Sequence, residues 1–87
     1  MINRDLIVEI LISLHDKKTS KKDLLAELHD ATGMLRAANY QAGFEMERVK
    51  EIISASSDYT EQHEVIKEKL ELALDMFDRE FDLRKKK

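Results

Sequence analysis

The segment at residues 58–84, DYTEQHEVIKEKLELALDMFDREFDLR, has the clearest periodicity in the chain. Asp58 and Glu61 have the spacing of a capping box, so a helix is expected to begin directly after Asp58. The apolar residues of the segment recur at helical spacing and cover roughly 200° of a helical wheel. These residues are Val65, Ile66, Leu70, Leu72, Ala73, Leu74, Met76, Phe77, Phe81 and Leu83. An apolar arc this wide contacts two neighbouring helices, which predicts a helical bundle.

Three further amphipathic segments precede this one. Asn3 and Ser20 are good N-cap residues for the first two, and Gly33 is a good stop for the second because glycine tolerates a left-handed conformation. The helices are therefore expected at approximately 3–16, 20–31, 34–55 and 59–84. This pattern predicts an all-α fold, either a compact bundle or an orthogonal array of about four helices. We expect one helical domain over 1–87, with a basic, frayed tail at 84–87.

The composition supports helices and excludes several classes of protein. The 87 residues contain no proline, no cysteine and only two glycines, too few turn formers for a β-barrel or β-sandwich. Without cysteine there are no disulfides or thiolate zinc sites, which fits a reducing compartment. The apolar stretch 6–14 is interrupted by Glu9 and Ser13 and is too short to span a bilayer or to act as a signal peptide. We therefore expect a cytoplasmic protein with no membrane association.

Charge is spread unevenly along the chain. Residues 1–22 carry five basic and three acidic groups, residues 23–83 carry six basic and fifteen acidic groups, and residues 84–87 are all basic. The net charge is −3, and most of the chain is acidic. This balance weighs against broad nucleic-acid binding.

Few residues carry the signature of catalysis or metal binding. Leu-His-Asp occurs at 14–16 and at 28–30, and we interpret both histidines as residues of a last helical turn, where they satisfy carbonyl groups. Neither His-x-x-x-His nor Glu-x-x-His occurs in the sequence. The carboxylates of 61–78 alternate with lysine and arginine, as on a solvated face. We therefore expect no enzymatic activity, no cofactor and no metal site.

The first predicted helix is apolar on nearly every side. Val8 and Ile12 lie on the side opposite the main apolar face, and only a narrow polar strip remains. A helix of this kind is normally buried on most sides. Either it is the central helix of the bundle, or Val8 and Ile12 lie in a self-association interface.

Tyr40 and Phe44 are four residues apart within the predicted helix 34–55, so their rings are expected to share one face. That face points away from the apolar stripe of the same helix. Two interpretations remain open: the rings form an exposed anchor for a partner protein, or the first helix packs over them.

A basic cluster favours a second function. Lys17, Lys18, Lys21 and Lys22 could contact phosphates, and the segment 7–48 follows the order of a helix-turn-helix motif. The third helix of that motif offers few base-reading side chains. The leading prediction is therefore a small, non-enzymatic regulator, adaptor, inhibitor or chaperone-like subunit of bacterial or phage type. It would bind another, unidentified protein and associate with itself as a homo-oligomer, in the simplest case a homodimer; the alternative is a DNA-binding transcriptional regulator.

Overall fold

The computed structural model describes residues 4–16 and 18–85. Its elements are α1 (Asp5–His15), α2 (Lys21–Ala37), α3 (Ala42–Ala55), the 3-10 turn η1 (Tyr59–Gln62) and α4 (His63–Lys85). The described residues contain no strand, so the all-α prediction is confirmed.

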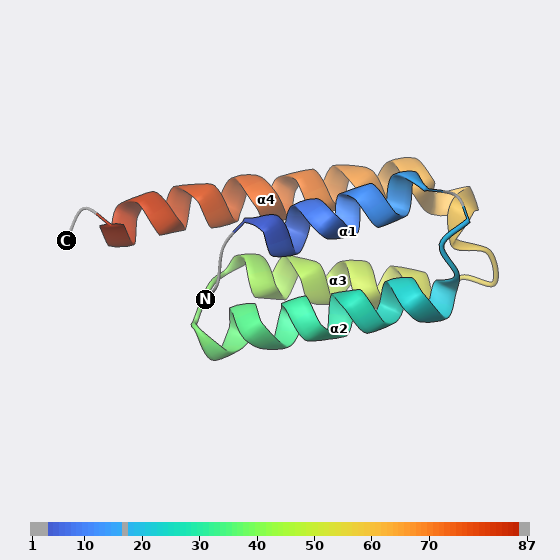
Figure 1. Cartoon of the computed structure of the whole chain (residues 1–87), viewed down its shortest axis with the longest axis horizontal. Helices are drawn as coiled ribbons and strands as arrows, with labels where there is room; N and C mark the ends of the chain where they lie inside the picture. Colours follow the sequence, from blue (N-terminus) through green and yellow to red (C-terminus); the bar gives the residue numbers. More distant parts are fainter. Residues whose placement is uncertain (1–3, 17, 86–87) are drawn as a thin grey trace.

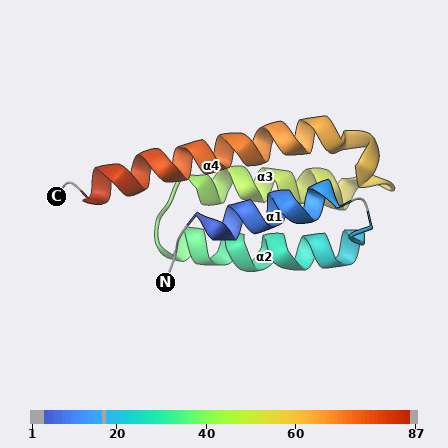
Figure 2. The same ribbon diagram turned by 45° about the horizontal axis from the view of Figure 1, so that its top comes forward.

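The four helices lie side by side, and consecutive helices run in opposite directions (Figures 1 and 2). α1 packs against α2 and α4, and α3 packs against the same two helices, so α1 and α3 lie diagonally across the bundle. This arrangement is an up-and-down bundle rather than an orthogonal array. α4 is the longest helix, and its C-terminal end extends beyond the other three (Figure 1).

All four helices contribute to one core, and two tyrosines outside them complete it. The buried apolar residues are Ile7, Ile10, Leu14, Leu24, Leu28, Ala31, Leu35, Tyr40, Ala42, Met46, Val49, Ile53, Tyr59, Ile66, Leu70, Ala73 and Phe77. The residues that α4 buries recur at intervals of three and four, as a helix with one face in the core requires. This buried stripe is narrower than the apolar arc of the sequence.

The predicted end of the second helix at Gly33 is wrong. Gly33 stays helical, because Thr32 and Leu35 continue the buried stripe of α2 beyond it. The chain instead leaves the helix at Asn39, which adopts the left-handed φ of 62° that asparagine tolerates. The amide of Tyr40 donates to the Leu35 carbonyl at 2.9 Å and that of Asn39 to the Arg36 carbonyl at 3.0 Å, which is a Schellman motif.

The two glycines have opposite roles, and alanine substitution should separate them. A Cβ at Gly43 would lie 2.8 Å from Arg36 Cγ and 3.1 Å from the Arg36 backbone nitrogen, so α2 and α3 approach too closely for a side chain. A Cβ at Gly33 meets nothing. We expect Gly43→Ala to lower the unfolding free energy by about 1–3 kcal/mol. Gly33→Ala should raise it by about 0.5–1 kcal/mol.

Denaturant titration of the two variants provides the measurement. We expect midpoint shifts of opposite sign relative to the parent chain. A Gly43→Ala protein as stable as Gly33→Ala would contradict the close packing of α2 against α3 at this position.

The tail predicted at 84–87 is partly structured. Arg84 and Lys85 belong to α4, and Lys86 and Lys87 lie outside the described residues. The Arg84 guanidinium donates to the carbonyl oxygens of Ala38 and Asn39, each at 2.8 Å. The expectation that Arg84 is frayed is therefore wrong, because its side chain holds the α2–α3 turn.

The opposite end of the bundle follows the sequence more closely. The Ser20 hydroxyl accepts a hydrogen bond from the Asp23 amide at 3.1 Å, as predicted for an N-cap. Asp58 accepts from the Thr60 hydroxyl at 2.6 Å and from the Thr60 amide at 3.0 Å, and these bonds lower the pKa of the Asp58 carboxyl. The Tyr59 hydroxyl donates a hydrogen bond to the Thr19 carbonyl. This bond links η1 to the loop between α1 and α2. The proposed cap Asn3 lies outside the described residues.

Candidate protein-binding surface

The outer face of α1 is the first candidate surface. Ile7, Ile10 and Leu14 point into the core, whereas Ile12 is 63% exposed and Val8 is half-buried. The interpretation of α1 as the central helix of the bundle is therefore wrong, because α2 and α4 cover only two of its sides. The outer face, which carries Val8 and Ile12, is left uncovered by the described residues.

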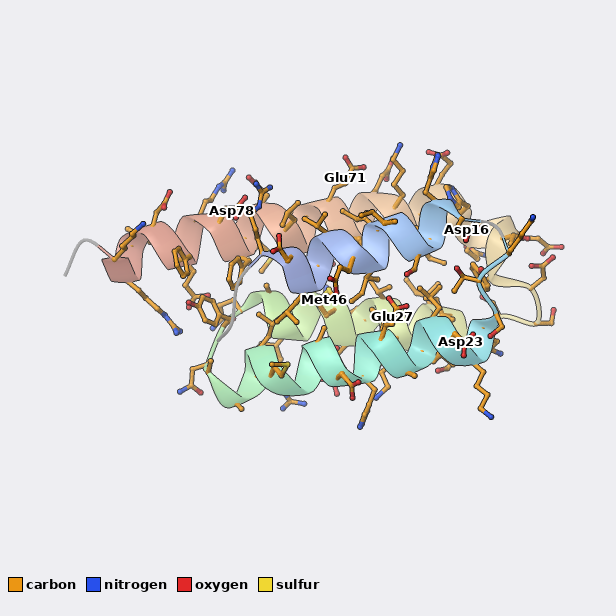
Figure 3. All side chains as sticks on the ribbon, viewed as in Figure 1. Asp16, Asp23, Glu27, Met46, Glu71 and Asp78 are labelled. Carbon is orange, nitrogen blue, oxygen red and sulfur yellow. The ribbon has the colours of Figure 1, made fainter. Side chains whose placement is uncertain are left out.

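A groove of about 280 Å³ lies beside this face, between α1 and α2. Leu6, Ile10, Ala31 and Met34 form its apolar part, and Glu9, Glu27 and Asp30 form its acidic part. The Ser13 hydroxyl donates to both carboxylate oxygens of Glu27, at 2.9 and 3.0 Å, and so orients this side chain between the two helices (Figure 3). The groove could not be predicted from the sequence, because its walls come from two helices whose relative placement the sequence does not state.

The expected pairing of Tyr40 and Phe44 on one face is wrong. Tyr40 lies in the α2–α3 turn rather than in a helix, so helical spacing does not relate it to Phe44. Tyr40 is 6% exposed and its ring centroid is 4.7 Å from that of Phe77 on α4. The covering helix is therefore α4 and not the first helix.

Phe44 alone remains exposed, with 51% of its surface open. The Arg36 guanidinium lies 5.1 Å from its ring centroid and also pairs with Glu47 at 3.0 Å. This cation–π contact covers part of the Phe44 ring. A partner-binding role for Phe44 stays a prediction, and the same role for Tyr40 has lost its structural basis.

The lysine cluster does not form one free basic face. Lys21 donates to the carbonyl oxygens of Ser54 at 3.2 Å and of Ser56 at 2.8 Å, and so satisfies acceptors at the C-terminal end of α3. Lys18 and Lys22 are exposed, and Lys17 lies outside the described residues. The role expected for Lys21 in the alternative function therefore conflicts with its structural role.

The histidines are distributed over three helices. His15 is in the last turn of α1, as predicted, but His29 is in the middle of α2, with its Nδ1 2.9 Å from Lys50 Nζ. His15 and His63 line a pocket of about 220 Å³ between α1 and α4. Within residues 4–16 and 18–85, no group of three or more His, Cys, Asp or Glu side chains is placed to hold a metal ion.

A second apolar stripe, on the outside of α4, was also missed. Val65 and Leu72 are seven residues apart and are 42% and 49% exposed, and Leu83 on the same side is 66% exposed. All three residues were expected to belong to the arc that contacts neighbouring helices. A helix can carry a buried stripe and an exposed one within a single wide arc, and the sequence alone does not separate them.

Comparison with known proteins gives no relative from which a function could be transferred: no family model, no curated protein and no solved structure matches the chain. None of the helices in the described ranges combines the length and the apolar character needed to cross a membrane.

Proposed function

We propose that this chain is a non-enzymatic protein-binding module, acting as a regulator, adaptor, inhibitor or chaperone-like subunit. Its contact surface is the outer face of α1. The observation that carries the proposal is the exposure of Ile12 beside the half-buried Val8 on a helix whose core side is already complete. A large aliphatic side chain that stays in water lacks the roughly 1.5–3 kcal/mol of stabilisation that burial provides, and contact with a partner protein would supply this free energy.

The DNA-binding alternative is less well supported. Lys21 already binds the end of α3, and the groove beside α1 is lined by carboxylates. A face of this charge repels phosphate. The absence of cysteine supports a reducing compartment, and we propose the cytoplasm.

Affinity capture from a lysate of the source cell tests the proposal. We expect the parent chain to retain one protein reproducibly, and Ile12→Asp to lose it while its melting temperature stays unchanged. Leu72→Asp on α4 is the matched control, because Leu72 is also an exposed aliphatic residue in the middle of a helix, and it should retain the protein. Loss through Leu72→Asp but not through Ile12→Asp would move the contact surface to α4 and refute the proposal for α1.

Self-association through the same face is a separate prediction. α1 has 11 residues and is therefore about 16 Å long, too short by itself for the roughly 800 Å² per partner of a stable interface. Two copies would also bring together the acidic residues that flank Ile12. We expect a weak homodimer that strengthens with added salt, because salt screens this repulsion.

Sedimentation equilibrium at several salt concentrations measures this association. Val8→Glu combined with Ile12→Glu should abolish the dimer and leave a folded monomer, since Ile12 is outside the core. If the parent chain is monomeric across the micromolar range at every salt concentration, self-association is excluded.

A further inference from the structure

The groove between α1 and α2 combines an apolar floor with an acidic border. Leu6 and Met34 contribute apolar surface at one end, and Met34 is 41% exposed. Glu9 and Asp30 are exposed carboxylates on the two opposite walls. None of the described residues that line the groove is a lysine or an arginine, so the negative charge is not neutralised there.

The acidic border continues along α2. On α2, Asp23, Glu27, Asp30 and Met34 are spaced i, i+4, i+7 and i+11, so three carboxylates and one apolar residue share an edge.

Among the described residues of α1, Glu9 is the carboxylate that lines the groove. Its neighbours Leu6 and Ile10 line the groove beside it, whereas Ile12 lies on the outer face of α1. Glu27 lies between α1 and α2 (Figure 3). The groove therefore has carboxylates on both walls.

This charge pattern indicates which kind of molecule the groove can bind. Carboxylates that are neighbours on a helix destabilise it slightly, and a cation placed between the walls would relieve their repulsion. A second copy of this chain would present the same acidic edges and be repelled, as would nucleic acid. A positively charged segment with its own apolar face complements both features of the groove.

From this we infer that the α1–α2 groove binds a cationic amphipathic helix of a partner protein. Its apolar residues pack against Leu6 and Met34, and its lysines or arginines pair with Glu9 and Asp30. This inference deepens the proposed function, because it states the chemistry of the partner and places its contact beside Ile12. The arrangement is a helix laid into a groove, in which spaced apolar side chains provide the anchors and flanking charges set the orientation.

A synthetic peptide tests the inference independently of any natural partner. The probe is a fluorescein-labelled peptide of about 18 residues, built from leucine and lysine so that the leucines form one helical face. Two comparison peptides keep the length: one replaces every lysine with glutamate, and one scrambles the order to remove the helical period. Binding is followed by fluorescence anisotropy at low and at physiological salt.

The amphipathic leucine–lysine peptide should bind, and its affinity should fall as salt rises, opposite to the salt dependence expected for self-association. Glu9→Lys combined with Asp30→Lys should weaken binding at least about tenfold. Glu68→Lys combined with Asp82→Lys makes the same change in net charge at exposed positions on α4, and should change affinity less than about threefold. Met34→Asn should also weaken binding, whereas Leu72→Asn should not.

Four results would overturn the inference: no binding of the amphipathic leucine–lysine peptide, equal binding of the scrambled peptide, equal binding of the glutamate peptide, or equal losses in the two charge-reversal variants. The last would indicate general attraction to an acidic protein. Because the capture experiment uses the natural partner and Ile12, it can succeed while the peptide fails. In that case the protein-binding function would stand and only the identity of the groove's occupant would be rejected.

Discussion

Replacing Phe77 with alanine should lower the unfolding free energy by about 3–5 kcal/mol, a loss that could unfold a bundle of this size at room temperature. Phe77 is 2% exposed and is the last residue of the buried stripe of α4. Its ring packs against Tyr40 at 4.7 Å and against Phe81 at 5.7 Å, so the cavity left by truncation would open beneath two aromatic neighbours. Urea titration followed by circular dichroism measures the loss.

Phe44→Ala is the control for Phe77→Ala, because it removes the same ring from an exposed position. Phe44 is 51% exposed, and its ring lies against the Arg36 guanidinium, so we expect a loss of about 1 kcal/mol or less. Phe77→Leu, which retains much of the volume, should fall between the two and keep the chain folded if the alanine variant does not fold. Equal losses at positions 77 and 44 would contradict the assignment of Phe44 to the surface.

Arg84→Ala should be the second large effect, with a loss of about 2 kcal/mol. The guanidinium donates to two backbone carbonyls of the α2–α3 turn and lies 3.9 Å from the Tyr40 ring centroid. Glu80 pairs with Arg84 at 3.2 Å and accepts from the Gln41 amide at 2.9 Å, at the start of α3. Truncation therefore removes two of the hydrogen bonds that attach α4 to this turn and the contact of the guanidinium with the Tyr40 ring, while the Glu80–Gln41 hydrogen bond and the Phe77 contact remain.

Arg79→Ala is the control for Arg84→Ala, because it removes the same type of side chain from the same helix. Arg79 forms an ion pair with Asp75 at 2.9 Å, also four residues back along α4, but both side chains are largely exposed. A pair of this kind contributes about 0.3–0.5 kcal/mol. Thermal melts of both variants give the comparison, and similar shifts for Arg79→Ala and Arg84→Ala would show that Arg84 acts as a surface charge only.

Local signals in the sequence predicted local structure well. Ser20 caps α2 as expected. Asp58 caps the 3-10 turn η1, and the last α-helix begins only at His63 rather than at 59. Helical periodicity included the four buried residues of α4, together with exposed ones. These features depend on residues within one or two turns of each other, so a single segment contains the information.

The predictions that the structure contradicts concern features that depend on residues far apart in the sequence. The α2–α3 turn forms at Asn39 rather than at Gly33, and its carbonyl groups are held by Arg84, which is 45 residues further along the chain from Asn39. The shifted turn also moved Tyr40 out of the helix and separated it from Phe44. The α1–α2 groove could not be predicted for a similar reason, although the acidic residues recurring at i, i+4 and i+7 on α2 were a visible signal.

Site-specific photo-crosslinking in the source cell tests the central claim, that this protein contacts its partner through the outer face of α1, most directly. A benzophenone amino acid placed at position 12 reports which protein touches that face, and the same amino acid at position 72 reports on the outside of α4. We expect a light-dependent adduct with another protein from position 12 and none from position 72. An adduct from position 72 alone, or from neither position, would contradict this claim.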